Sequence, residues 1–195
     1  MSYILPMDSS PDPRIERTRR LVLDAAVETV ATMGFDNATI EGIADRCGVA
    51  RSTIYRHWGN KEQLVLEAMK SRLIESAPQP TGDLRTDLIA FLTATARWLG
   101  TPEGAMMALA IVSAAQRDPD IRRAHAAGTR AKREQLVAIL ERGVATGELP
   151  AHLDTTEAAN DIVGPLMYRR LITHEPVDDE YIAARTDRWL AATRV

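Results

Sequence analysis

The sequence has a single cysteine, Cys47, so no intrachain disulfide and no cysteine cluster for a metal can form. Both absences fit a reducing cytosol. No window approaches the roughly 18 apolar residues of a membrane span, and residues 1–13 lack the basic start of a signal peptide. We therefore expect a cytoplasmic protein without membrane association, preceded by a disordered tail at residues 1–13.

The motifs of common enzyme classes are missing as well. The chain contains no GxSxG, HExxH, P-loop or GxGxxG motif, and its 4 histidines show no metal-ligand spacing. We expect no catalytic site, no metal and no cofactor.

Signals for β-strands are scarce. Aromatic residues make up 5% of the chain, and neither a clean apolar alternation nor an Asn-Gly hairpin turn occurs. Alanine, leucine and arginine are abundant, and 45% apolar content in 195 residues is enough for a substantial core. These features predict an all-α protein.

The first predicted helix runs from Pro13 to Met33 and ends at Gly34. Phe35 follows that glycine, at the position where a hydrophobic contact commonly folds the chain back over a helix end. The expected apolar stripe of this helix comprises Ile15, Val22, Ala26, Val30 and Met33.

Two short helices and a longer one follow. Thr39 is placed to cap a helix that Gly48 closes, and a second short helix carries residues 51–57. Asn60 then caps a helix that extends to residue 76. Two short helices joined by a tight glycine turn form a helix-turn-helix unit.

Basic charge is concentrated in two segments, although the net charge of the chain is -3. Residues 14–20 hold four arginines against one glutamate, and residues 46–61 hold three arginines and Lys61 without any acid. Such a run is usually a solvated helix face. The alternatives for Arg14 to Arg20, a phosphate-contacting arm or an ordinary exposed face, stay open.

The stretch from Arg14 to Met69, "RIERTRRLVLDAAVETVATMGFDNATIEGIADRCGVARSTIYRHWGNKEQLVLEAM", resembles the N-terminal domain of the TetR family of bacterial transcriptional regulators. The resemblance includes "GF", "TIEGIADRCGV" and "STIYRHWGNKEQL" in order and spacing. It implies a three-helix DNA-binding domain at residues 14–77 and a helical effector-binding and dimerisation domain at residues 83–195.

The helix over residues 51–57 is the expected reading helix. Its N-terminal turn suits contact with base edges in the major groove, because such helices read bases with their first residues. The base-reading candidates are Arg51, Ser52, Thr53 and Tyr55. The resemblance assigns phosphate contacts to Thr39, His57 and Lys61. Ile54 and Trp58, spaced i and i+4, are expected to pack in the core.

A linker at residues 77–82 precedes five more predicted helices. They cover residues 83–99, 103–116, 119–145, 155–174 and 179–192. Bulky side chains in this alanine-rich part are candidates for a pocket that binds a largely apolar small molecule. They are Phe91, Trp98, Met106, Met107 and Tyr168, and Thr95 is expected to supply a polar contact one turn after Phe91.

The last two helices, near 155–174 and 179–192, are expected to form a homodimer interface. They retain apolar residues after the domain should already have a core, namely Ile162, Leu166, Ile172, Ile182, Trp189 and Leu190. The combined expectation is a repressor that binds a pseudo-palindromic operator in double-stranded DNA and is released by an effector. The alternative is an activator or architectural DNA-binding protein whose second domain serves dimerisation or a protein partner.

Overall fold

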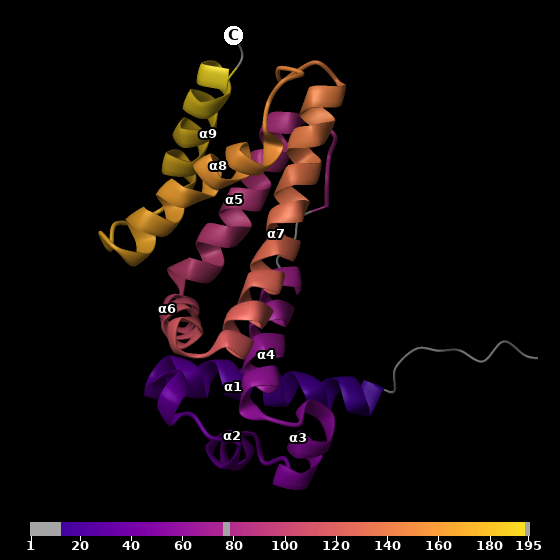
Figure 1. The fold of residues 1–195 in the computed structure, drawn as a ribbon, viewed down its shortest axis with the longest axis vertical. Coiled ribbons are helices and arrows are strands. Elements are labelled where there is room, and N and C mark those ends of the chain that lie inside the picture. The colour runs from indigo at the N-terminus through magenta and orange to yellow at the C-terminus, as the bar shows by residue number, and fades with distance from the viewer. Residues whose placement is uncertain (1–12, 76–78, 194–195) are drawn as a thin grey trace, which may run out of the picture.

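The computed structural model describes residues 13–75 and 79–193, and all regular structure within these ranges is α-helical. The predicted tail lies outside the described residues, apart from Pro13, which begins the first helix. The helices are α1 Pro13–Asn37, α2 Ile40–Cys47, α3 Arg51–Trp58, α4 Lys61–Glu75, α5 Leu84–Gly100, α6 Pro102–Arg117, α7 Pro119–Ala145, α8 Thr155–Leu171 and α9 Asp179–Thr193 (Figure 1). The expected all-α class is confirmed.

Helix boundaries follow local capping chemistry. The Thr39 hydroxyl accepts a hydrogen bond from the amide of Gly42 at 3.1 Å, and the Asn60 side chain accepts one from the amide of Gln63 at 2.8 Å. Gly48 ends α2 in the left-handed conformation, with φ at 69°. These caps confirm the boundaries predicted around the helix-turn-helix.

Gly34 interrupts α1 as predicted, with φ at 77° and ψ at 162°, and Phe35 turns inward to become 6% exposed. The two ends of the predicted apolar stripe were wrong. Ile15 and Met33 are 54% and 51% exposed, whereas the middle of the stripe is fully buried. Ile15 lies in the first turn of α1 and Met33 directly precedes the break at Gly34, so periodicity alone overestimated the buried length.

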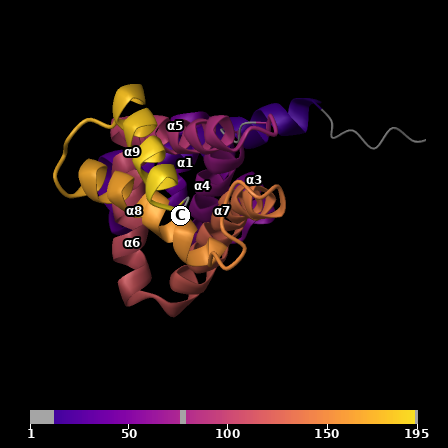
Figure 2. The same cartoon turned by 90° about the horizontal axis from the view of Figure 1, so that it is seen from above.

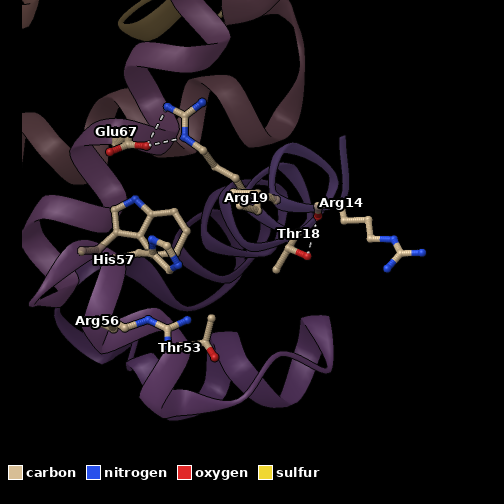
Figure 3. Close-up of a pocket in the computed structure, with 9 residues that line it drawn as sticks. Arg14, Thr18, Arg19, Thr53, Arg56, His57 and Glu67 are labelled. Carbon is tan, nitrogen blue, oxygen red and sulfur yellow. Dashed lines mark hydrogen bonds and ion pairs between the residues drawn. The ribbon is translucent and has the colours of Figure 1, made fainter. Parts of the chain in front are cut away.

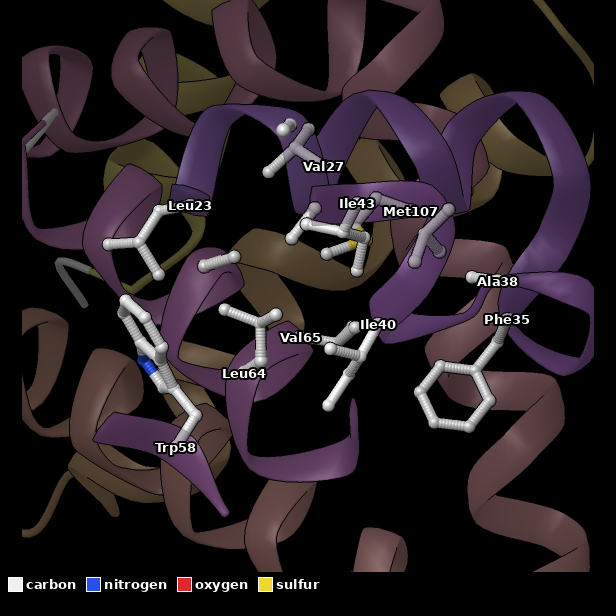
Figure 4. Close-up of a cluster of buried hydrophobic side chains, with 14 of the residues drawn as sticks. Leu23, Val27, Phe35, Ala38, Ile40, Ile43, Trp58, Leu64, Val65 and Met107 are labelled. Carbon is white, nitrogen blue, oxygen red and sulfur yellow. The ribbon is translucent and has the colours of Figure 1, made fainter. Parts of the chain in front are cut away.

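The first hydrophobic cluster, called the lower core here, joins the helix-turn-helix to the helices above it. It contains buried side chains of α1 to α4 together with Met107, Ile111, Ala114 and Ala115 of α6 and Ile121 of α7. Figure 4 shows Met107 among the side chains of this cluster, and Figure 1 shows α6 lying directly on α1. Packing is therefore continuous across the boundary that the sequence places at residues 77–82.

The second cluster, called the upper core, is formed by α5, α7, α8 and α9. Seen from above, these helices lie side by side over the lower end of the molecule (Figure 2). The upper core includes five of the six apolar residues expected at a dimer interface: Ile162, Leu166, Ile182, Trp189 and Leu190. That residue assignment was wrong, because each of them fills the core of its own subunit and is at most 9% exposed.

Helix α8 ends earlier than predicted, at Leu171 instead of residue 174. The amides of Ile172 and Thr173 both donate to the carbonyl of Tyr168, which terminates the helix, and His174 takes a positive φ of 57°. The chain thus leaves the helix before Pro176 instead of being stopped by it. Over the ranges that could be described, no helix is both long and apolar enough to cross a membrane.

Candidate DNA-binding surface and effector region

Helix α3 is held by its inner face and presents its outer face to solvent. Ile54 and Trp58 are 0% and 9% exposed and pack in the lower core, as predicted. Arg51 and Ser52 are exposed on the first turn, and Tyr55 is 46% exposed one turn further on. Thr53 lies half-buried beside them. A short helix anchored in this way can enter a groove without losing its own packing.

Two acidic side chains of α2 contact the expected base-reading residues. The Arg51 guanidinium lies 3.8 Å from a carboxylate oxygen of Asp45, and the Tyr55 hydroxyl donates to a carboxylate oxygen of Glu41 at 3.5 Å. Both contacts are long and exposed, so they are weak and leave Arg51 and Tyr55 available to DNA. Glu41 and Asp45 are spaced i and i+4, the one sequence signal that could have indicated their shared face.

A hollow of about 340 Å³ lies between the start of α1 and the end of α3. Arg14 and Thr18 of α1 line one side, and Thr53, Arg56 and His57 of α3 line the other (Figure 3). The sequence leaves open whether Arg14 contacts phosphate or is simply exposed. The packing of α1 against the helix-turn-helix places basic side chains of both helices around one hollow, which Glu67 and its ion-pair partner Arg19 also line. The excess of basic groups there favours an anionic group such as a phosphate.

The remaining predicted phosphate contacts differ in their availability. His57 is exposed, whereas the hydroxyl of Thr39 already accepts the capping hydrogen bond. Lys61 donates through Nζ to the carbonyl oxygen of Phe35 at 2.8 Å, and its Nζ lies 4.6 Å from the centroid of the Phe35 ring. Lys61 therefore also fixes the end of α1 to the start of α4.

The six residues predicted to line an effector pocket do not form one cluster. Phe91, at 5% exposure, packs in the upper core, while the fully buried Met107 packs in the lower core. Thr95 is buried and donates its hydroxyl to the Phe91 carbonyl at 2.9 Å. Trp98 is half-buried. Met106 and Tyr168 are 48% and 61% exposed on the outside of the subunit.

Sequence reasoning missed two basic residues on the inner side of α7. Nζ of Lys132 lies 5.7 Å from the centroid of the Phe91 ring, and burial lowers the pKa of Lys132 to about 8. Burial also lowers the pKa of His125, seven residues earlier on the same helix. His125 and Lys132 are spaced along the helix in line with apolar residues, and this spacing is the sequence signal that could have indicated their place on the inner side.

Comparison with known proteins gives a family match for each half of the chain. Residues 22–68 match the family described as bacterial regulatory proteins, tetR family, and residues 78–188 match the tetracyclin repressor-like C-terminal domain. The chain belongs to the TetR family. The helix-turn-helix-type transcriptional regulator YdeS of Bacillus subtilis (strain 168) is 34% identical over 174 residues, which cover 87% of this chain and 86% of YdeS.

Solved structures extend the comparison to the fold of the TetR family. The TetR family transcription regulator SCO0332 shares 30% identity with a TM-score of 0.69, covering 91% of this chain and 98% of that chain. FadR from Bacillus subtilis, solved in complex with stearoyl-CoA, has a TM-score of 0.69 at 22% identity, with coverage of 88% and 95%. This chain is accordingly a helix-turn-helix transcriptional regulator and not an enzyme.

Proposed function

We propose that this TetR-family regulator is a repressor that acts in the cytoplasm as a homodimer and leaves its operator when a small molecule binds. The observation that carries the proposal is the first turn of α3. Arg51 and Ser52 are exposed there while Ile54 and Trp58 hold the back of the helix in the lower core. Arg51 is positioned to bind guanine through two hydrogen bonds, and Tyr55 extends the same face.

The proposed dimer would read two half-sites of a pseudo-palindromic operator, spaced by about one helical turn or a multiple of it. Support for an interface at the end of α8 comes from Tyr168 in its last turn and Ile172 directly after it, two large apolar side chains that are each 61% exposed. The inner residues of α8 and α9 are used within the subunit, so the interface we propose uses the outer faces of these helices.

The effector is proposed to bind among α5, α6 and α7. FadR from Bacillus subtilis was solved with stearoyl-CoA, so a protein of this fold holds a small molecule. An effector shifts the population away from the DNA-binding state only if it binds the other state more tightly. The lower core offers a physical connection, because α6 packs on α1.

The proposal is tested by mapping genome-wide binding, footprinting the sites, and measuring affinity for one footprinted duplex and a scrambled duplex. We expect Arg51→Ala to lower specific affinity by about 1–3 kcal/mol and to relax preference at one base pair of each half-site. His57→Ala should weaken binding to both duplexes alike, because phosphates carry no sequence information. Arg130→Ala, an exposed change on α7, is the matched control.

Equal affinity of the wild-type protein for the two duplexes would refute sequence-specific reading by α3. Specific binding that no small molecule weakens would instead support the alternative of an activator or architectural protein.

A further inference from the structure

The inner stripe of α7 changes character along its length. Ile121 near the start and Leu136 further on are 3% and 0% exposed and belong to the lower and upper cores. Between them, at helical spacing on the same face, lie His125, Gly128 and Lys132, all half-buried. A stripe that is apolar at both ends therefore has two basic residues and a glycine in its middle.

Gly128 marks unfilled space in this stripe. A Cβ atom added at Gly128 would meet no atom within 4 Å, so close packing is not the reason for the glycine. Its backbone does not need glycine either, because its φ is not among the positive values of this chain. Glycine inside a helix is less favourable than alanine by about 1 kcal/mol. The missing side chain leaves room beside His125 and Lys132.

Lys132 faces this part of the molecule without a counter-charge. Among residues 13–75 and 79–193, Lys132 forms no ion pair with a carboxylate, and its described contact is with the Phe91 ring, 5.7 Å from its Nζ to the ring centroid. A cation over an aromatic ring offsets only part of the cost of removing an ammonium group from water. Burial accordingly lowers the pKa of Lys132 to about 8.

The helices around this stripe offer apolar surface. Phe91, Thr95 and Trp98 are spaced i, i+4 and i+7 along α5, which packs against α7. The hydroxyl of Thr95 is engaged with its own helix, the Phe91 ring is 5% exposed and Trp98 is half-buried, so the face of α5 toward α7 is apolar and chiefly aromatic. The basic groups lie on α7 and the rings on α5.

We infer that the space beside Gly128 receives the acidic group of an amphipathic organic anion, which pairs with Lys132 while its apolar body lies against Phe91 and Trp98. The inference rests on the proposed function, because it names the chemical class of the effector. It refines the expectation of a largely apolar ligand to one that also carries a carboxylate, sulfonate or similar group. An anion would supply the partner that Lys132 lacks, and it would bind best when Lys132 is charged.

The test compares two fluorescent probes with the same ring system, anilinonaphthalene sulfonate and the uncharged phenylnaphthylamine. Their dissociation constants are measured by fluorescence titration of the full chain without DNA. Lys132→Met keeps the length and apolar stem of the side chain and removes its charge, and Lys70→Met on the exposed side of α4 is the matched control. Gly128→Leu fills the proposed space.

We expect Lys132→Met to weaken binding of the sulfonate by on the order of thirtyfold while changing the uncharged probe less than twofold. Lys70→Met should change neither probe, and Gly128→Leu should weaken both. Equal sulfonate affinity in the wild-type protein and Lys132→Met overturns the inference, as does a wild-type protein that binds neither probe. Operator binding by the wild-type protein, measured separately, tests the proposed function. If the wild-type protein binds no operator, the proposed function is refuted. If it binds its operator but Lys132→Met leaves the affinity for the sulfonate unchanged, only the anion site is refuted.

Discussion

Asp87 at the start of α5 is the buried carboxylate on which the sharpest stability prediction rests. It is 2% exposed and accepts hydrogen bonds from the amide and hydroxyl of Thr81, both at 2.7 Å, and from the amide of Gly82 at 3.2 Å. Arg142 of α7 completes the shell with an ion pair. One carboxylate thus joins the segment before α5 to the end of α7.

The magnitude follows from these contacts. Removing one partner of a buried ion pair costs about 3–5 kcal/mol, because the other charge is left buried without compensation. The Arg142 side chain is 33% exposed, so water recovers part of that loss, whereas the amides of Thr81 and Gly82 lose their acceptor. We therefore expect Asp87→Ala to lower the free energy of unfolding by about 3–4 kcal/mol and Asp87→Asn by roughly half as much.

Urea denaturation followed by circular dichroism measures both effects. Asp187→Asn breaks an exposed ion pair with Arg85 and is the control that should leave the free energy of unfolding nearly unchanged. Burial alone would raise the pKa of Asp87, but hydrogen bonds from Thr81 and Gly82 and the charge of Arg142 outweigh it and lower the pKa. The loss in free energy of unfolding caused by Asp87→Asn should therefore be constant near neutral pH and shrink as the pH falls through the lowered pKa of Asp87. A deficit no larger than that of Asp187→Asn would refute the reasoning.

Two further predictions concern α7 and the dimer. The pKa of Lys132 is about 8 in the folded chain, below the ordinary lysine value of about 10.4, so the unfolded chain binds more protons between these values. The free energy of unfolding should rise across that window in the wild-type protein relative to Lys132→Met, and parallel pH profiles would contradict this. If the outer surface at the end of α8 forms the homodimer, replacing both Tyr168 and Ile172 by glutamate should give monomers in sedimentation without changing the helical content. An unchanged dimer mass would place the interface elsewhere.

Local chemistry explains what could be predicted from the sequence. Thr39, Gly48 and Asn60 act through contacts within four residues, so their capping roles could be read directly and the helix-turn-helix boundaries are confirmed. Ile54 and Trp58 were placed in the core because their spacing leaves one face for packing.

Residues whose surroundings come from distant segments were harder to predict. Periodicity shows that Ile182 and Leu190 face an apolar environment, but it does not distinguish the core of one subunit from an interface between two, and they belong to the core. The grouping of Arg14 with Arg56 depends on how α1 crosses α3, which no local pattern encodes. Lys132 was missed for a similar reason, since its lack of a counter-charge is a property of the folded chain.

The lower core has a consequence for how regulators of this kind can be recombined. A hybrid made by joining residues 13–75 of this chain to the effector half of a relative would separate α1 from the α6 surface around Met107 and Ile111. Two half-cores of different shape would then meet where close packing is required, and buried methylene groups lost there cost stability directly. A workable exchange should therefore transfer α6 and the first turn of α7 together with the DNA-binding helices. The boundary between the parts that determine operator specificity and effector specificity then lies beyond the linker.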